Sequence, residues 1–75
     1  MLKVHAKNLE NVAVLYLEGR IVTGETEPLR NDMPYLDGKS EVILDLTRVT
    51  TVDAHGLGVL LQLREQALTK GVRMS

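Results

Sequence analysis

The chain has 75 residues, so it forms at most one domain, and it lacks cysteine, which excludes disulfides, thiolate metal sites and thiol chemistry. Its net charge of -1 and its two aromatic residues argue against nucleic-acid binding, which needs a basic face or a stacking platform. No apolar run approaches the roughly 18 residues of a membrane span. We therefore expect a small cytoplasmic domain that has no cofactor, no metal and no direct membrane insertion.

The first third of the chain predicts a β-hairpin. Residues 2–7 alternate between apolar and polar side chains, which is typical of a half-buried strand at a sheet edge. Residues 8–11 predict a turn. The nearly continuous apolar run 12–19 predicts a second strand, antiparallel to the first, which Gly19 ends or interrupts with a bulge.

Residues 23–37 are more polar and predict a short or distorted helix. Pro28 suits the first turn of a helix, where its missing N–H costs nothing. Pro34 argues against a long helix because its ring clashes with the carbonyl four residues earlier. The apolar positions that share one helical face are Leu29, Met33 and Leu36.

A buried strand and a strong helix follow. Residues 41–46 read EVILDL and predict a central strand that is buried on both faces. Residues 54–70 predict a helix with Asp53 as its N-cap and Gly71 just past its end. An apolar stripe on this helix, broken only by Arg64, consists of Leu57, Leu60, Leu61 and Leu68.

The final residues, 72–75, predict the start of another strand. The whole order predicts an α/β fold over residues 1–75: a mixed β-sheet, made of the hairpin and a right-handed parallel β-α-β unit, with helices packed on it. In such sheets, binding sites lie at the carboxyl ends of strands, beside the next helix N-terminus. Residues 50–58 occupy such a place.

Three stretches resemble the STAS domain family of anti-sigma factor antagonists. "LEGRI" resembles a strand end of the family, and "VILDLTRVTTVD" resembles its central strand with the following loop. "DAHGLGVLLQL" resembles its Asp-Ser-Ser-Gly-Leu-Gly signature, which opens a helix. The match covers nearly the whole chain, and its third part is the specific one.

The resemblance implies a protein-binding role and no enzymatic activity. In the family, the second hydroxyl of the signature is phosphorylated by a partner kinase that is also the anti-sigma factor. The unphosphorylated form binds that partner and frees the sigma factor, which regulates transcription. The residues that would form the partner-binding surface here are Thr50, Thr51, Asp53, Ala54, His55, Gly56, Leu57 and Gly58.

This sequence departs from the family where the switch lies. Ala54 and His55 stand at the two hydroxyl positions, so the phosphosite-equivalent residue, His55, has no hydroxyl. Val22 stands where many members have an acidic residue. The usual serine switch therefore cannot operate at position 55.

Three interpretations of His55 remain open. It is a neutral surface imidazole whose partner binding is constitutive, or its protonation tunes binding, or phosphoryl transfer occurs on His55 itself, on Thr50 or on Thr51. Asp53 needs no function beyond capping the helix. An acid–base enzyme built on His55 and Asp53 is a distant third class, because the sequence supplies no nucleophile or oxyanion site.

The resemblance also bears on assembly, because family members run longer, with a further strand and a C-terminal helix. We therefore expect either a truncated, C-terminally short domain or a fragment, with an open sheet edge and an uncovered apolar face. A homodimer formed by strand pairing or swapping at the C-terminal end would repair both. The alternative function is a structural adaptor subunit of a lipid-transport or transporter complex that uses the same fold.

Overall fold

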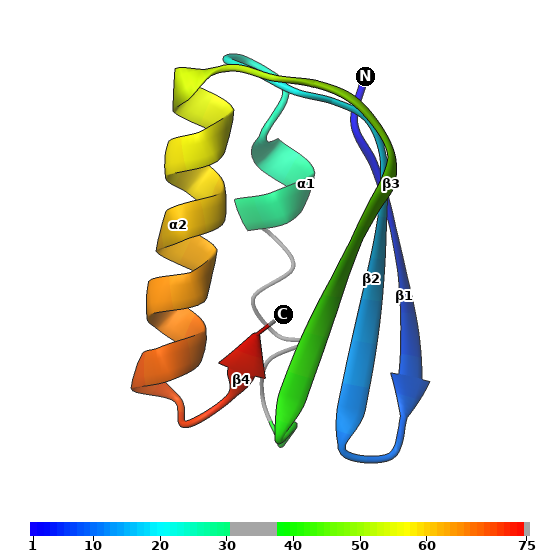
Figure 1. Cartoon of the computed structure of the whole chain (residues 1–75), viewed down its shortest axis with the longest axis vertical. Coiled ribbons are helices and arrows are strands. Elements are labelled where there is room, and N and C mark those ends of the chain that lie inside the picture. Colours follow the sequence, from blue (N-terminus) through cyan, green and yellow to red (C-terminus); the bar gives the residue numbers. More distant parts are fainter. Residues whose placement is uncertain (31–37, 75) are drawn as a thin grey trace.

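The computed structural model describes residues 1–30 and 38–74, which form one four-stranded sheet with two helices on one of its faces (Figure 1). Strand β2 pairs antiparallel with β1 and parallel with β3, and β4 is parallel to β3, in the sheet order β1-β2-β3-β4. The predicted mixed sheet is therefore confirmed. The elements are β1 Lys3–Leu9, β2 Val12–Ile21, α1 Glu27–Arg30, β3 Glu41–Val52, α2 Ala54–Thr69 and β4 Arg73–Met74.

The hairpin has a tighter turn and a longer second strand than predicted. Strands β1 and β2 stay paired up to Leu9 and Val12, so only Glu10 and Asn11 form the turn, with Glu10 at a φ of 56°. Gly19 has a φ of 107° and lies beside a register shift between β2 and β3. Its bulge is confirmed, but β2 continues beyond it and carries the chain toward the start of α2.

Strand β3 is buried on one face only, so the prediction that both of its faces are buried is wrong. Val42 is fully buried under the helices, whereas the side chain of the next residue, Ile43, points to the opposite face and is exposed. Both helices lie on the same side of the sheet, which leaves the other face of β3 in solvent (Figure 1). The apolar run alone did not reveal this, because a strand covered on both faces has the same composition.

The hydrophobic core lies between the sheet and the two helices. Short helix α1 contributes Leu29, which is fully buried. Met33, Pro34 and Leu36, on which the rest of the predicted helix rests, lie outside the described residues. The largest fully buried side chains are Leu15, Leu17, Ile21, Leu29, Val42 and Leu63.

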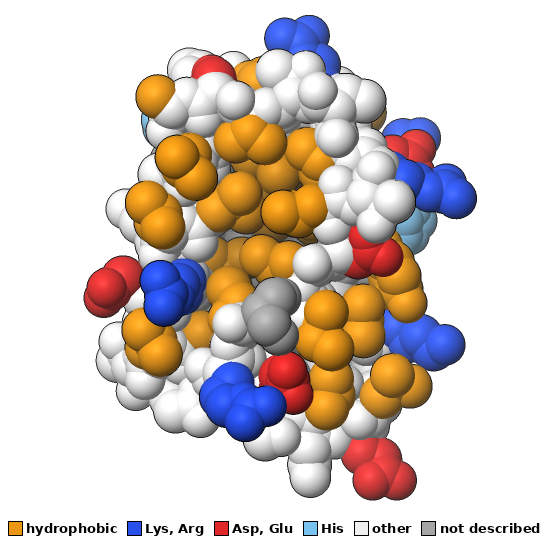
Figure 2. Space-filling model, in the orientation of Figure 1, with side chains coloured by type: hydrophobic (Ala, Val, Ile, Leu, Met, Phe, Trp, Pro, Cys, Tyr) orange, Lys and Arg blue, Asp and Glu red, His pale blue; other side chains and the backbone are white. Residues whose placement is uncertain are grey.

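The predicted apolar stripe of α2 is not the face that packs on the sheet. The buried residues of α2 are Gly56, Val59, Leu63 and Ala67, a set rotated by about a third of a turn from the predicted stripe. Of the predicted stripe, only Leu60 packs partly against the core. Helix α2 is therefore apolar on two sides, and Figure 2 shows hydrophobic side chains along it on the face in view. The other leucines of the stripe, Leu57, Leu61 and Leu68, are 53%, 52% and 59% exposed.

The C-terminal end of α2 follows the sequence prediction. Gly71 adopts a φ of 73°, and the N–H of Val72 donates to the carbonyl of Ala67 at 2.8 Å, which closes the last turn. The next residues form the short strand β4 beside Glu41 and Val42. The β-α-β unit is thereby complete.

Candidate functional site: the junction of β3 and α2

A single residue separates strand β3 from helix α2. Asp53 has an extended backbone, and its Oδ1 accepts the N–H of Gly56 at 2.7 Å, while its carbonyl accepts the N–H of Leu57 at 2.9 Å. The bond to Gly56 satisfies one of the N–H groups that the first turn of a helix leaves unpaired, and the bond from Leu57 is the first bond within the helix. The predicted N-cap is confirmed.

The second carboxylate oxygen of Asp53 reaches another segment of the chain. Its Oδ2 accepts both the N–H and the hydroxyl of Thr23, each at 3.0 Å. The N–H of Asp53 itself donates to the carbonyl of Ile21 at 3.3 Å. The end of β2, the end of β3 and the start of α2 are thus held together by one side chain.

These hydrogen bonds favour the ionised carboxylate. The pKa of the Asp53 carboxyl lies below its usual value, chiefly because the backbone N–H groups of Thr23 and Gly56 donate to it. Desolvation raises this pKa by less than either backbone hydrogen bond lowers it, and the Thr23 hydroxyl and the charge of His55 lower it slightly further. Asp53 is therefore a structural anion at neutral pH.

The two glycines of the signature have different roles. A Cβ on Gly56 would collide with the carbonyl oxygen of Ile21, so this glycine lets α2 approach β2 closely. A Cβ on Gly58 would meet nothing within 4 Å. Gly56 is therefore needed for packing, whereas Gly58 leaves the first turns of α2 without side-chain bulk.

His55 projects from the exposed side of the first turn of α2. Its side chain lines a shallow hollow with Ala54, Gly58 and Gln62. Leu57 is not part of this hollow, since helical geometry places it across α2 from His55. The predicted partner-binding residues of α2 thus lie on two different sides of the helix, with Gly56 buried between them.

Thr50 and Thr51 lie at the exposed end of β3, close to this junction in sequence. The hydroxyl of Thr50 donates to the carbonyl of Gly19 at 3.2 Å, so it helps to hold β3 beside β2. Thr51 pairs with Arg20 across the two strands. Both residues flank the junction from the strand side.

The comparisons with known proteins identify the family to which this fold belongs. The family model described as STAS domain matches residues 3–75. The chain belongs to the STAS domain family. Among curated proteins, no sequence relative was found.

Solved structures with the same fold include anti-sigma factor antagonists. The antagonist from Mycobacterium paratuberculosis is 20% identical, with a TM-score of 0.83 over 99% of this chain and 64% of that chain. Unphosphorylated SpoIIAA, also an anti-sigma factor antagonist, is 16% identical, with a TM-score of 0.73 over 99% of this chain and 69% of that chain. Mglu is 25% identical, with a TM-score of 0.85 over 95% of this chain but only 18% of that chain. This STAS domain therefore spans about two thirds of the antagonists and less than a fifth of Mglu.

The sequence did not predict that Thr23 belongs to the junction. Thr23 is thirty residues from Asp53 in the chain, and it reaches the carboxylate because β2 and β3 run parallel and end together, with Ile21 beside Val52. No local motif signals this contact. The contact could have been found by considering the loop that follows β2, because β2 is the parallel neighbour of β3 and ends at the same edge of the sheet.

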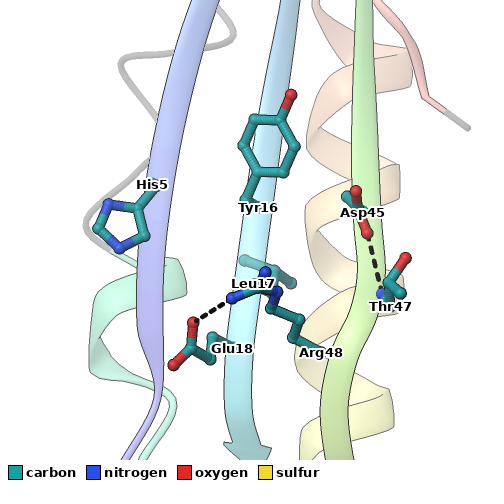
Figure 3. A pocket seen from close by; sticks show the side chains of 7 residues that line it. All are labelled: His5, Tyr16, Leu17, Glu18, Asp45, Thr47 and Arg48. Carbon is teal, nitrogen blue, oxygen red and sulfur yellow. Dashed lines mark hydrogen bonds and ion pairs between the residues drawn. The ribbon is translucent and has the colours of Figure 1, made fainter.

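A larger hollow, of about 430 Å³, lies on the open face of the sheet (Figure 3). His5 and Tyr16 stand on β1 and β2, and the Asp45 carboxylate accepts the N–H of Thr47 at 2.9 Å. Arg48 lies 3.8 Å from Glu18. The charged groups in this hollow pair with neighbours, which is typical of a solvated sheet face and offers no catalytic arrangement. The residues that line it are His5, Tyr16, Leu17, Glu18, Asp45, Thr47 and Arg48.

The two glycines of α2 provide a matched pair of variants. Gly56→Ala should lower the free energy of unfolding by about 1–3 kcal/mol or more, because the new methyl group collides with backbone. Gly58→Ala should raise it by up to about 1 kcal/mol, because alanine favours the helix and the site is open. Urea denaturation followed by circular dichroism measures both, and the opposite order of stabilities would contradict the assigned packing.

Asp53 should make the fold sensitive to acid. A carboxyl whose pKa is lowered by folding stabilises the folded state when the pH is above the pKa of that group in the unfolded chain. This stabilisation is lost as the pH falls through the lower pKa of the group in the folded protein. We expect the urea concentration at the unfolding midpoint to decrease as the pH is lowered from neutral to about 3. The decrease should be smaller in Asp53→Asn, because asparagine does not titrate. Glu25 and Asp45 also have lowered pKa values, so part of the fall remains.

The matched control for this measurement is Glu65→Gln, which removes an exposed carboxylate from α2 without touching the junction. This variant should keep the full acid response of the natural sequence. An acid response in Asp53→Asn as large as that of the natural sequence would show that the hydrogen bonds of Asp53 do not stabilise the fold.

Proposed function

We propose that this STAS domain binds a protein partner of the anti-sigma factor and serine kinase type through the junction of β3 and α2. The fold shared with the antagonists is that of a non-enzymatic interaction module, which supports the proposal. A role in transcription regulation and a cytoplasmic location are part of it. The proposed surface consists of Thr50, Thr51, Asp53, Ala54, His55, Gly56, Leu57 and Gly58, with buried Gly56 acting by holding the helix close to β2.

The observation that carries this proposal is the exposed position of His55 on a firmly capped helix start. Asp53 fixes the first turn of α2 through Gly56, and Thr23 fixes the same carboxylate from the other side. A partner therefore meets a preformed surface and has little ordering to do on binding. Within residues 1–30 and 38–74, no helix has the length and hydropathy to traverse a bilayer.

The imidazole at position 55 also determines the regulation that we propose. A serine kinase moves the γ-phosphoryl group of ATP to a hydroxyl oxygen, and the hydroxyl proton and ADP leave. His55 offers no hydroxyl, and the hydroxyl of nearby Thr50 already donates to the carbonyl of Gly19. Thr51 lies within strand β3, where it pairs with Arg20. We therefore propose that the partner binds this chain constitutively, without release by ATP.

Self-association is a further part of the proposal. Strand β4 pairs with β3 only at Glu41 and Val42, so the rest of that edge of β3 has no strand beside it in the described part of the chain. Three leucines of α2 are more than half exposed on a chain of only 8.3 kDa. Exposed apolar area of this kind favours association.

The variant His55→Ser tests the proposed function directly. With the anti-sigma factor kinase of the same organism, Mg²⁺ and γ-labelled ATP, we expect no label in the natural sequence and one acid-stable phosphoryl group at position 55 in the variant. In a pull-down, the natural sequence should stay bound when ATP is added, whereas the variant should be released, since a phosphate adds about -1.5 to -2 of charge.

His55→Ala is the matched control, because it removes the imidazole without supplying a hydroxyl, and it should behave like the natural sequence. A kinase that is active on its own substrate but leaves His55→Ser unlabelled would argue against this class of partner. Acid-labile label on the natural sequence would instead support transfer to His55. A gene neighbourhood with a permease and an ATPase, and no sigma factor, would favour the transporter adaptor.

A further inference from the structure

We propose that a second copy of this chain packs against the exposed side of α2, in an antiparallel arrangement of the two helices. This inference rests on the proposed self-association and names the face that carries it. The face is the leucine stripe, which consists of Leu57, Leu61 and Leu68, with Arg64 between the last two.

The spacing of the stripe is that of a helix-to-helix seam. Successive positions 57, 61, 64 and 68 are separated by four, three and four residues, which is the repeat that keeps a seam facing a partner helix. The buried positions of α2 already account for its packing on the sheet, and they share no residue with the stripe. The stripe is therefore a second, independent contact surface.

Charge favours the antiparallel arrangement of the two helices. In a parallel pair, Arg64 of each copy would face Arg64 of the other, which places like charges at the seam. In an antiparallel pair centred between positions 62 and 63, Arg64 faces Leu61 of the second copy, and Leu57 faces Leu68. The aliphatic stem of the arginine then covers a leucine while its guanidinium stays in water. A two-fold axis repeats each contact, as a closed dimer requires.

Apolar surface continues beyond the leucine stripe. Figure 2 shows hydrophobic side chains over α2 and in the hollow beside it. At its lower end the stripe continues into a hollow of about 350 Å³, lined by Arg64, Leu68, Glu41, Arg73 and Met74.

Pairing through the edge of β3 is less favourable than pairing through α2. The register of β3 shifts between the residues that pair with Tyr16 and Glu18, which marks a bulge in β3 between Asp45 and Arg48. Inside it, the N–H of Thr47 donates to the Asp45 side chain. A bulge and a charged side chain on an edge are features that oppose strand addition.

The stripe and His55 lie on opposite sides of α2, so a dimer of this kind leaves the proposed partner surface free. Gln62, on the side of His55, provides a matched control for Leu61. Leu61→Glu and Gln62→Glu add the same charge to neighbouring exposed positions. Because neither residue is buried, both variants should keep the circular dichroism spectrum of the natural sequence.

Light scattering at micromolar concentration tests the proposal. We expect twice the monomer mass of 8.3 kDa for the natural sequence and for Gln62→Glu. Leu61→Glu should be monomeric, with a dimer dissociation constant raised at least about tenfold. A natural sequence that stays monomeric would overturn both the self-association and the face. A dimeric Leu61→Glu would overturn the face alone.

The absence of cysteine allows a second test that needs no loss of stability. A mixture of Leu61→Cys and Arg64→Cys chains, distinguished by a tag, should form a disulfide between the two variants on mild oxidation. The same mixture with Gln62→Cys in place of Leu61→Cys should not. Equal cross-linking in the two mixtures would contradict the antiparallel arrangement, while phosphorylation of His55→Ser would still report on the proposed function separately.

Discussion

The carboxylate of Asp53 is the constraint on which the rest of this STAS domain depends. One oxygen closes the first turn of α2 at Gly56, and the other holds Thr23 in the loop after β2. Two segments thirty residues apart, the loop after β2 and the start of α2, thereby meet at one point. The lowered pKa of this carboxyl reflects the same hydrogen bonds, so the charge that caps the helix is also the charge that fixes the loop. The exposed tip beside it, with His55, is preorganised because the hydrogen bonds of Asp53 fix the turn that carries it.

Local sequence predicted the features that depend on neighbouring residues. The first strand, the bulge at Gly19, the cap at Asp53 and the stop at Gly71 all follow from short-range chemistry, and all are present. The features that could not be predicted depend on which helices cover which face of the sheet. The exposure of Ile43 follows from both helices lying on one face of the sheet, a fact that no run of apolar residues contains.

The stripe of α2 and the role of Thr23 illustrate the same limit at the site. Both sides of α2 are apolar at helical spacing, so the sequence does not say which side meets the sheet. Gly56 decides the matter, because the helix can approach Ile21 only where a side chain is missing. The contact between Thr23 and Asp53 depends on the parallel pairing of β2 and β3, and sequence patterns report strands without reporting their neighbours.

The most direct test of this account is an NMR titration of the ¹⁵N-labelled chain with the anti-sigma factor kinase. The account predicts that the amide signals of Thr23, His55 and Gly58 shift or broaden together, while those of the open sheet face at His5 and Tyr16 stay in place. Changes confined to the sheet face, with the junction unaffected, would contradict it.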